Sequence, residues 1–333
     1  MPSYLFLGQL NREYILPVEG RPLLDAAGGP VLYAAAGAAL WGAAVGLVSR
    51  VGENFPQHWL EDLAARGWDV SGVRVLPQPL ETRRVLIYDQ QGRLSAAQPL
   101  QAFARRGITL PRELLTYRPP APRRTDLDTP TPYTLRLSDL PPRFAEARGA
   151  HFCPHDYLTH SLLPATLRTA GVPFISLEPH PSYMDPLFAD RLPALLTGLT
   201  VFLVREQVLR GLFHHLTGDL WDMAAELARW PVKNIVIRRA GGETWLYETA
   251  SGRRWVVPGY PVQVSDPTGA HDAFAGAFLA AYRETLDPVQ ALVRGAVTAS
   301  VVCETSGAFA LLDVLPDLLR RRAEVLAEAV RKV

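Results

Sequence analysis

Apolar residues fall into short runs separated by helix-like segments, and this alternation predicts an α/β fold. The run Tyr4 to Leu7 predicts a first buried strand. After Gly28-Gly29-Pro30, a small-residue segment continues to Trp41 and is typical of a helix, because proline is tolerated in the first helical turn. A strand from Ala44 to Val51 and a helix from Pro56 to Arg66 follow. This order of strand, helix and strand predicts parallel pairing.

The alternation returns in the second half of the chain. We expect strands at 149–153, 173–177, 200–204 and 233–238, with helices near 158–170 and 219–229. An antiparallel pair at 244–248 and 253–257 and three helices near 269–284, 288–305 and 315–331 complete the pattern. The sequence therefore predicts a single domain, residues 1–333, with a doubly wound, mostly parallel sheet flanked by helices.

Residues 73–98 have a different pattern. Two short runs, Thr82 to Tyr88 and Arg93 to Ala97, flank Asp89-Gln90-Gln91-Gly92, which is a strong turn signal. We expect an antiparallel two-stranded flap here, as part of a small β lid formed from about 10–20 and 73–135. The apolar residues at 85–87 would need a cover on such a ribbon, and a homodimer is the expected cover.

The overall composition excludes several classes of protein. With 48% hydrophobic and 20% charged residues the chain is globular, and its formal net charge of +1 gives no excess of positive charge for binding a nucleic-acid polymer. The most apolar stretch, Ala34 to Val48, is shorter than the roughly 20 residues that cross a bilayer, and the first residues lack the pattern of a signal peptide. We expect a cytoplasmic protein without a membrane partner.

One segment carries the clearest chemistry. Residues 265–272, Ser-Asp-Pro-Thr-Gly-Ala-His-Asp, place small residues at the opening of an apolar helix, where unpaired N–H groups and the helix dipole attract an anion. Asp272, one turn in, can accept a proton from a hydroxyl while the neighbouring amides stabilise a transferring phosphoryl group. The alternative is that Asp272 only complements the helix N-terminus.

This segment resembles the C-terminal signature of the ribokinase, or PfkB, family of carbohydrate and nucleoside kinases, usually written D-T-x-G-A-G-D. The order of features along nearly the whole chain is similar too: a strand ending at Gly8, the Gly28-Gly29 pair, the stretch Val48 to Asn54, and a flap. Residues 28–34 and 174–179 look most like a fungal killer-maintenance branch of the family. The resemblance implies a ribokinase-like fold.

The resemblance also implies an activity, which is transfer of the γ-phosphoryl group of ATP, with Mg²⁺, to a hydroxymethyl group of a small sugar or sugar-like substrate. Asp272 would be the base, and the amides of Gly269, Ala270 and His271 would form the anion hole. Nucleotide contacts are expected from Arg205, Arg238, Gly241, Gly242, Thr268, Cys303 and Gly307.

The acceptor substrate is expected to lie beside Gly28 and Gly29, where the absence of side chains lets the backbone approach a polyol closely. A tight turn into the following helix is the alternative reading of these glycines. Asn11 and Glu13 stand where the family usually has a polar pair including an Asp. Because Glu13 is one methylene longer, we expect a pocket that is narrower or differently angled.

Four positions depart from the family pattern. His271 replaces the last glycine of G-A-G-D, and its side chain would either clash with phosphate or add a hydrogen bond. Arg205 and Val208 stand at the named positions of the N-x-x-E motif that helps organise magnesium, and Arg205 is either a phosphate contact or a surface charge. The nucleotide-loop glycines fit residues 238–243 only with a shifted register, and Ala296 replaces an Asn. A ligand-binding or regulatory protein with weakened or no catalysis is therefore the second hypothesis.

Two further hypotheses have less support. The His, Cys and Asp side chains between His151 and His160 are types that bind zinc, but Pro154 breaks their spacing, which favours a buried strand end with scattered histidines. An oxidoreductase that binds a dinucleotide would need G-x-G-x-x-G after the first strand, and this motif is absent.

Overall fold

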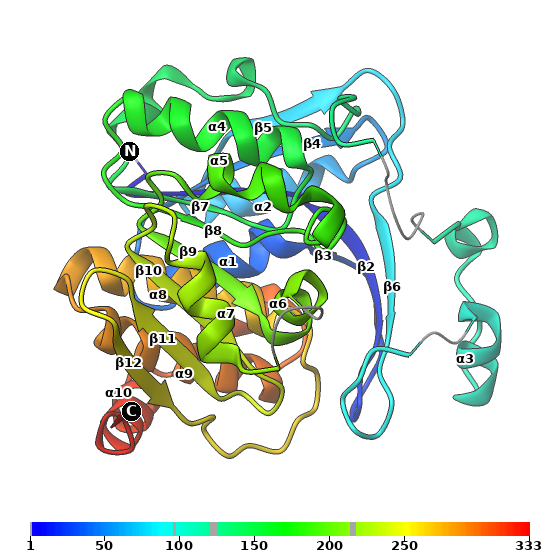
Figure 1. Ribbon diagram of the computed structural model, residues 1–333. Coiled ribbons are helices and arrows are strands. Elements are labelled where there is room, and N and C mark those ends of the chain that lie inside the picture. The colour runs from blue at the N-terminus through cyan, green and yellow to red at the C-terminus, as the bar shows by residue number, and fades with distance from the viewer. Residues whose placement is uncertain (1, 96–97, 120–125, 214–217) are drawn as a thin grey trace.

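The computed structural model describes residues 2–95, 98–119, 126–213 and 218–333. Its main sheet has ten strands in the order β13-β12-β11-β10-β9-β8-β7-β1-β4-β5 (Figure 1). The strands from β10 to β5 in this order are parallel, and β11, β12 and β13 add antiparallel at one edge. The strands are β1 (Tyr4–Leu7), β4 (Val45–Gly52), β5 (Asp69–Leu76), β7 (Gly149–Phe152), β8 (Ile175–Leu177), β9 (Val201–Arg205), β10 (Asn234–Arg238), β11 (Thr244–Glu248), β12 (Arg253–Val257) and β13 (Arg331–Lys332).

Helices cover both faces of this sheet because successive strand residues point to opposite sides. Tyr4 and Phe6 of β1 join one apolar cluster, and Leu5 and Leu7 join the other. The first cluster packs under α1 (Pro30–Ala39), α2 (Gln57–Ala65), α8 (Ala270–Thr285), α9 (Pro288–Glu304) and α10 (Pro316–Glu328). The second packs under α4 (Tyr157–Thr169), α5 (Leu192–Leu196), α6 (Glu206–Phe213) and α7 (Leu220–Leu227). The doubly wound α/β fold expected from the sequence is confirmed.

The element boundaries agree with the expected ones within a few residues, with one exception near the C-terminus. The last helix ends at Glu328 rather than near 331, because Arg331 and Lys332 pair with β12 as an added edge strand. Short 3₁₀ turns connect other elements: η1 (Arg112–Thr116), η2 (Leu137–Asp139), η3 (Pro142–Glu146), η4 (Pro186–Arg191) and η5 (Ala308–Asp313). Across the described ranges, no helix is both long and apolar enough to cross a membrane.

The lid is a separate three-stranded sheet in the order β3-β2-β6, formed by β2 (Asn11–Leu16), β3 (Leu23–Gly28) and β6 (Arg83–Ile87) (Figure 1). The expected antiparallel flap from 82–88 and 93–97 is wrong. The 89–92 turn forms, but it closes only one bridge, Tyr88 to Leu94, while β6 pairs in parallel along its whole length with β2. Ala96 and Ala97 lie outside the described residues.

The outer face of the lid is covered by the chain itself. Tyr14, Leu16 and Ile87 pack against Phe103 of α3 (Pro99–Arg105) and Leu114 of η1. Figure 1 shows α3 beyond β6, on the side away from the main sheet. The apolar face that suggested a dimer is thus closed within one chain, and a homodimer stays a prediction for sedimentation to test.

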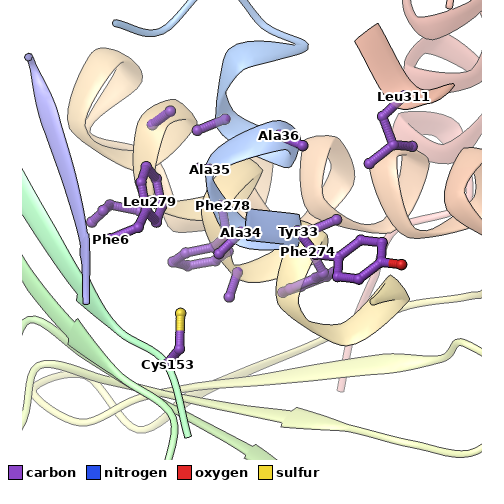
Figure 2. Packing of buried hydrophobic residues seen from close by; sticks show 14 of the residues in the cluster. Phe6, Tyr33, Ala34, Ala35, Ala36, Cys153, Phe274, Phe278, Leu279 and Leu311 are labelled. Carbon is purple, nitrogen blue, oxygen red and sulfur yellow. The ribbon is translucent and has the colours of Figure 1, made fainter. Parts of the chain in front are cut away.

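Two helices cross closely and place the candidate site. Gly37 of α1 and Gly276 of α8 lie at the crossing, where an added Cβ would come within 2.1 Å of the Ala273 oxygen and 1.7 Å of the Ala34 oxygen. Figure 2 shows Tyr33 and Ala34 of α1 beside Phe274 of α8. Because only glycine permits this approach, α1 and α8 are held in direct backbone contact at this crossing.

Candidate functional site

Charged residues meet where neighbouring parallel strands end. Glu178 directly follows β8, and Arg205 and Arg238 are the last residues of β9 and β10. Arg205 and Arg238 are register partners, so their side chains leave the sheet on the same face. The strand order reverses at β1, and doubly wound sheets bind ligands at the carboxyl ends of strands near such a reversal. This edge is the candidate site.

The N-terminus of α8 faces this edge and begins at a glycine that no other residue can replace without strain. Gly269 is the N-cap of α8 and has a left-handed backbone with φ of 76°. A Cβ built on Gly269 would lie 2.1 Å from ring atoms of Tyr33. Both the backbone angle and the ring contact therefore require glycine at this position.

Two backbone amides at this helix start have no acceptor in the part of the chain that the structure describes. The amide of Ala270 donates to the Pro267 carbonyl at 3.2 Å, so one of the three expected anion-hole donors is already engaged. The amides of Gly269 and His271 have no backbone or side-chain acceptor among the described residues. Two free amides at the positive end of a 16-residue helix favour a negative group in front of them.

The loop before α8 is braced by a buried aspartate. Asp266, 1% exposed, accepts hydrogen bonds from the Thr268 amide at 3.0 Å and the Ser306 hydroxyl at 2.7 Å. The amides of Ser265 and Asp266 also donate to the carbonyl of Cys303, at 2.7 and 3.2 Å. These bonds fix the entry to α8, so its free amides are held in place before any ligand arrives.

Asp272 lies half-buried in the first turn of α8. Burial raises the pKa of its carboxyl to about 7, and the negative charge of Glu178 adds to the effect, while Arg205 and Arg238 oppose it. A carboxyl with this pKa is near the protonation balance that suits a general base at neutral pH. The predicted base therefore stands in an environment that fits its predicted role.

Glu178 was not singled out from the sequence, yet it is a deeply buried acid whose charge acts on Asp272. It is 2% exposed, and its Oε1 lies 3.1 Å from the Nε of Arg205. The contact lacks hydrogen-bond alignment, and neither Glu178 oxygen accepts a hydrogen bond from the described residues. The Arg205 side chain is 34% exposed, so its guanidinium extends from this buried carboxylate toward solvent. Arg205 is therefore no ordinary surface charge.

Arg238 lies beneath the helix start. Its side chain donates to the carbonyl of His271 and, at 3.3 Å, to that of Ala270, and its guanidinium stacks over the Phe274 ring at 4.2 Å. Burial lowers the pKa of Arg238 to about 10, which leaves it charged at neutral pH. Arg238 thus supports the first turn of α8 while adding positive charge behind the free amides.

The imidazole of His271 is uncharged at neutral pH. Burial, followed by the positive charge of Arg238 and Arg205, holds its pKa well below the usual range. Its Nδ1 is buried and has no hydrogen-bond partner among the described residues. Of the two effects expected for this replacement, an added hydrogen bond is the one that an unused nitrogen allows.

On the lid side, the longer Glu13 folds back under the two glycines. Its Oε1 accepts from the Gly29 amide at 2.8 Å and its Oε2 from the Tyr33 hydroxyl at 3.1 Å. A Cβ on Gly28 would lie 2.1 Å from Oε2, so glycine is needed there to admit the carboxyl. Burial raises the pKa of Glu13 to about 7. The sequence predicted an altered pocket, and the structure shows that this acid braces the Gly28-Gly29 turn.

Asn11 remains open for a ligand. It is 6% exposed and pairs with Gly28 in the register of β2 and β3. Its Oδ1 is buried without a hydrogen-bond partner among the described residues. An unsatisfied buried amide oxygen costs free energy, which a bound hydroxyl group would recover.

The remaining residues predicted to contact a nucleotide lie on three separate segments. Gly241 and Gly242 form the turn between β10 and β11, with φ of 83° and 88°. The carbonyl of Cys303 accepts hydrogen bonds from the loop before α8. Gly307 is the N-cap of η5 and lies close to Leu23 of the lid. These positions do not by themselves define where a nucleotide base would bind, so the nucleotide contacts of these residues remain predictions.

The lid is docked onto the loop before α8. The Thr268 hydroxyl donates to the Tyr88 hydroxyl at 3.1 Å. The Glu19 amide donates to the Ser265 carbonyl at 3.2 Å, and Gln263 donates to the Glu19 carboxylate at 2.8 Å. The lid therefore contacts the loop that positions the anion-binding amides.

Sequence reasoning missed Tyr33, Tyr88 and Glu178. Tyr33 sits inside a small-residue helix and Tyr88 at the end of a lid strand, and nothing local marks either as part of the site. Glu178 did carry a signal, since it is the first charged residue after the buried run Ile175–Leu177.

The histidines between positions 151 and 160 are held by other groups. Nδ1 of His151 contacts the Ser176 hydroxyl at 2.9 Å, His160 contacts the Cys153 carbonyl and the Tyr183 hydroxyl, and His155 lies 3.3 Å from Asp156. No three or more His, Cys, Asp or Glu side chains of the described residues form a group that could hold a metal.

The residues at the expected magnesium-organising positions lack the side chains that bind this ion. The two positions of N-x-x-E hold Arg205 and Val208, which offer no oxygen ligand, and Glu178 is in contact with Arg205. Magnesium in proteins is bound by oxygen ligands. The side chains present do not fit a protein-held Mg²⁺ ion at this position.

Comparisons with known proteins identify a family and a relative that this chain resembles. Residues 163–314 match the family described as pfkB family carbohydrate kinase. A cytidine kinase from Thermococcus kodakarensis is 26% identical over 242 residues, which are 72% of this chain and 73% of that protein.

Solved structures share the fold at low sequence identity. A fructokinase with bound ATP from Xylella fastidiosa has a TM-score of 0.69 and 20% identity, with 98% of this chain and 99% of that chain covered. A nucleoside kinase from Burkholderia thailandensis in complex with inosine has a TM-score of 0.66 and 17% identity, with 97% and 98% covered. Likeness at this level shows the fold.

Proposed function

We infer from these comparisons that the chain is a kinase of the ribokinase/PfkB family, and we propose that it transfers the γ-phosphoryl group of ATP to a hydroxymethyl group of a sugar or nucleoside-like acceptor. The support for ATP and for such acceptors comes from the relatives, among them a fructokinase with bound ATP and a cytidine kinase.

One observation carries the proposal. A half-buried carboxyl with a pKa raised to about 7, that of Asp272, stands in the first turn of a helix whose Gly269 and His271 amides lack acceptors. This pairs a base for a hydroxyl proton with donors for phosphoryl oxygens. Such positioning and electrostatic stabilisation are the main demands of phosphoryl transfer.

The proposed reaction is an in-line displacement. The acceptor oxygen forms a bond to the γ-phosphorus, the bond from that phosphorus to the β,γ-bridging oxygen breaks, and ADP leaves. The proton of the acceptor hydroxyl passes to the carboxylate of Asp272. The amides of Gly269 and His271 hold the phosphoryl oxygens during the transfer, with Arg238 adding positive charge behind them.

We propose that Arg205 contacts the phosphates of the nucleotide, since its guanidinium is 34% exposed and starts at the same strand edge. Gly241, Gly242, Thr268, Cys303 and Gly307 would surround the rest of the nucleotide. Any Mg²⁺ would arrive on the phosphates of ATP, because the side chains at N-x-x-E do not fit the ion.

A second candidate function has one observation in its favour. Glu178 and Arg205 are already in contact, and Arg205 and Val208 replace the metal-organising motif. A protein that binds nucleotide or sugar without efficient transfer would tolerate both features.

The test compares wild type with Asp272→Asn, and with Asp62→Asn as a matched control on the exposed face of α2. ADP release is followed with ATP, Mg²⁺ and a panel of sugars and nucleosides, and nucleotide binding is followed by thermal shift. The proposal expects turnover by wild type and the control, at least about 1,000-fold less in Asp272→Asn, and ADP binding in all three. Binding without turnover in wild type would favour the second candidate, and full turnover by Asp272→Asn would remove Asp272 from the mechanism.

A further inference from the structure

Three arginines on the lid strands differ in their surroundings. Arg12 of β2 and Arg83 of β6 are register partners on the outer face, where Tyr14 and Ile87 also pack against the chain's own cover. Arg12 is bound to Asp25 at 2.7 Å, and Arg83 is bound to Glu81. Both outer arginines are therefore neutralised by a carboxylate.

Arg84 lies on the opposite, inner face. It is the register partner of Glu13, and paired residues of neighbouring strands point to the same side of a sheet. Glu13 contacts the Gly28-Gly29 turn, so this inner face is the one that faces the acceptor side of the candidate site. Nη2 of Arg84 donates at 3.2 Å to the side-chain oxygen of Gln9, which follows β1 at the carboxyl edge of the main sheet.

Arg84 has no carboxylate within ion-pair distance among the described residues. Its guanidinium also donates a hydrogen bond at 2.8 Å to the neutral carbonyl of Arg83. The charge of Arg84 lowers the pKa of Glu81, but Glu81 is already bound to Arg83. Arg84 is half-buried, so part of its hydration has been lost without a counter-charge in return.

Other positive charges act on the loop after β8, which contains His180. The pKa of His180, in the loop after β8, is lowered to about 4, first by loss of solvent and then by the positive charge of His155, Arg205 and Arg84. Asp156 is the acid that acts in the opposite direction on His180, and it is paired with His155. Arg84 therefore adds positive charge next to the loop after β8, where the acid that acts on His180 is already paired.

We propose that Arg84 binds an anionic group of the acceptor, a carboxylate or a phosphate, so that the substrate is an acidic or phosphorylated sugar rather than a neutral one. The planar guanidinium fork suits either group, because both present two oxygens at matching separation. The buried, unpartnered Oδ1 of Asn11, on the same inner face, would accept a hydrogen bond from a hydroxyl of the same ligand. This inference rests on the proposed kinase function.

The experiment uses pairs of acceptors that differ in one group, which is anionic in one member and a neutral hydroxyl in the other. D-gluconate is compared with D-glucitol, and D-fructose 6-phosphate with D-fructose, each with ATP and Mg²⁺, and KM and kcat are measured separately. We expect the anionic member of at least one pair to be the better acceptor. Arg84→Gln should raise its KM about 10- to 100-fold, the range expected when a charged hydrogen-bond partner is removed, and leave the neutral member within about twofold.

Arg83→Gln is the matched control, since it removes a neighbouring arginine of the same strand from the outer face. It should leave the discrimination between charged and neutral acceptors unchanged. The pair that responds to Arg84→Gln identifies the anion as carboxylate or phosphate. Wild-type preference for the neutral members, or equal effects of Arg84→Gln on both members, would overturn the proposal while leaving the kinase function standing.

Calorimetric binding of the same four compounds in the presence of ADP separates this inference from the kinase function. Arg84-dependent binding of gluconate or fructose 6-phosphate without any phosphoryl transfer would support the anion site and contradict the kinase function. If neither anionic compound binds or reacts, the anion site is rejected.

Discussion

The strongest test of the site is a single methyl group added at Gly269. In Gly269→Ala the new Cβ would stand 2.1 Å from Tyr33 ring atoms, at a residue with φ of 76°. Because the ring of Tyr33 is 2% exposed and its hydroxyl binds Glu13, it has little room to withdraw. The substitution therefore combines backbone strain with overlap against a fixed ring.

The expected magnitude follows from these two effects. A left-handed backbone costs a non-glycine residue about 1–2 kcal/mol, and overpacking a filled site costs about 1–3 kcal/mol. We expect a loss of about 2–5 kcal/mol in the free energy of unfolding. For 333 residues the unfolding entropy is about 0.7 kcal/mol per degree, so Tm should fall by about 3–7 °C.

Gly67→Ala is the matched control. Gly67 follows α2 with φ of 80°, and an added Cβ there meets nothing within 4 Å. It carries the backbone strain alone, which predicts a fall in Tm of about 1–3 °C. Thermal and denaturant unfolding measure both variants.

Turnover gives an independent readout of the same change. Displacement of the Gly269 amide or of Tyr33 by an ångström should lower kcat by about 100-fold, whereas Gly67→Ala should keep wild-type kcat. If Gly269→Ala is as stable and as active as Gly67→Ala, then the contact with Tyr33 does not position the start of α8 and the reasoning is wrong.

Two pH-dependent results are also expected. Asp272 must be ionised to act as a base, so kcat should fall about tenfold per pH unit below its pKa of about 7. Glu178→Gln removes a negative charge that raises this pKa, so the acidic limb of the pH–rate profile should move to lower pH. An acidic limb that stays in place would show that Glu178 does not influence Asp272. The pKa of Glu13 is raised from 4.5 to about 7, so the folded state holds this proton more tightly than the unfolded state. The resulting stability, about 3 kcal/mol at most, is complete below pH 4.5 and is lost as the pH rises through 7. Denaturant unfolding between pH 5 and 8 should show this slope in wild type and a smaller one in Glu13→Gln; equal slopes would refute the assignment.

The main sheet was predictable because its central strands are buried on both faces. Runs such as Val201–Val204 and Ile235–Ile237 are continuously apolar, and helices on either side leave them few alternatives. The lid was not predictable in the same way. β2 carries Arg12 and Glu13 among apolar residues, and its identity as a strand depends on β3 and β6, which lie far apart in the chain.

The candidate site was likewise predictable only where its residues are close together in the sequence. Gly269 and Asp272 belong to one contiguous motif, so the anion-binding helix start could be predicted as a unit. The position of Glu178 beside Asp272 arises only when β8 and α8 pack together. The inward conformation of the Glu13 side chain depends on its length and on the space left by Gly28. No local sequence pattern encodes this pairing of two distant residues.

The close crossing of α1 and α8 has a consequence for how this protein can move. The Gly28-Gly29 turn leads into α1, and the amides of Gly269 and His271 lie at the start of α8. Gly37 and Gly276 bring the backbones of these two helices into contact with no side chain between them. The turn and these amides are therefore held as one rigid unit, and we expect any opening of the candidate site to come from the lid. A larger residue at either of the two crossing glycines would change the distance between the proposed acceptor and nucleotide positions. It would not change the contacts that each position makes with its own ligand.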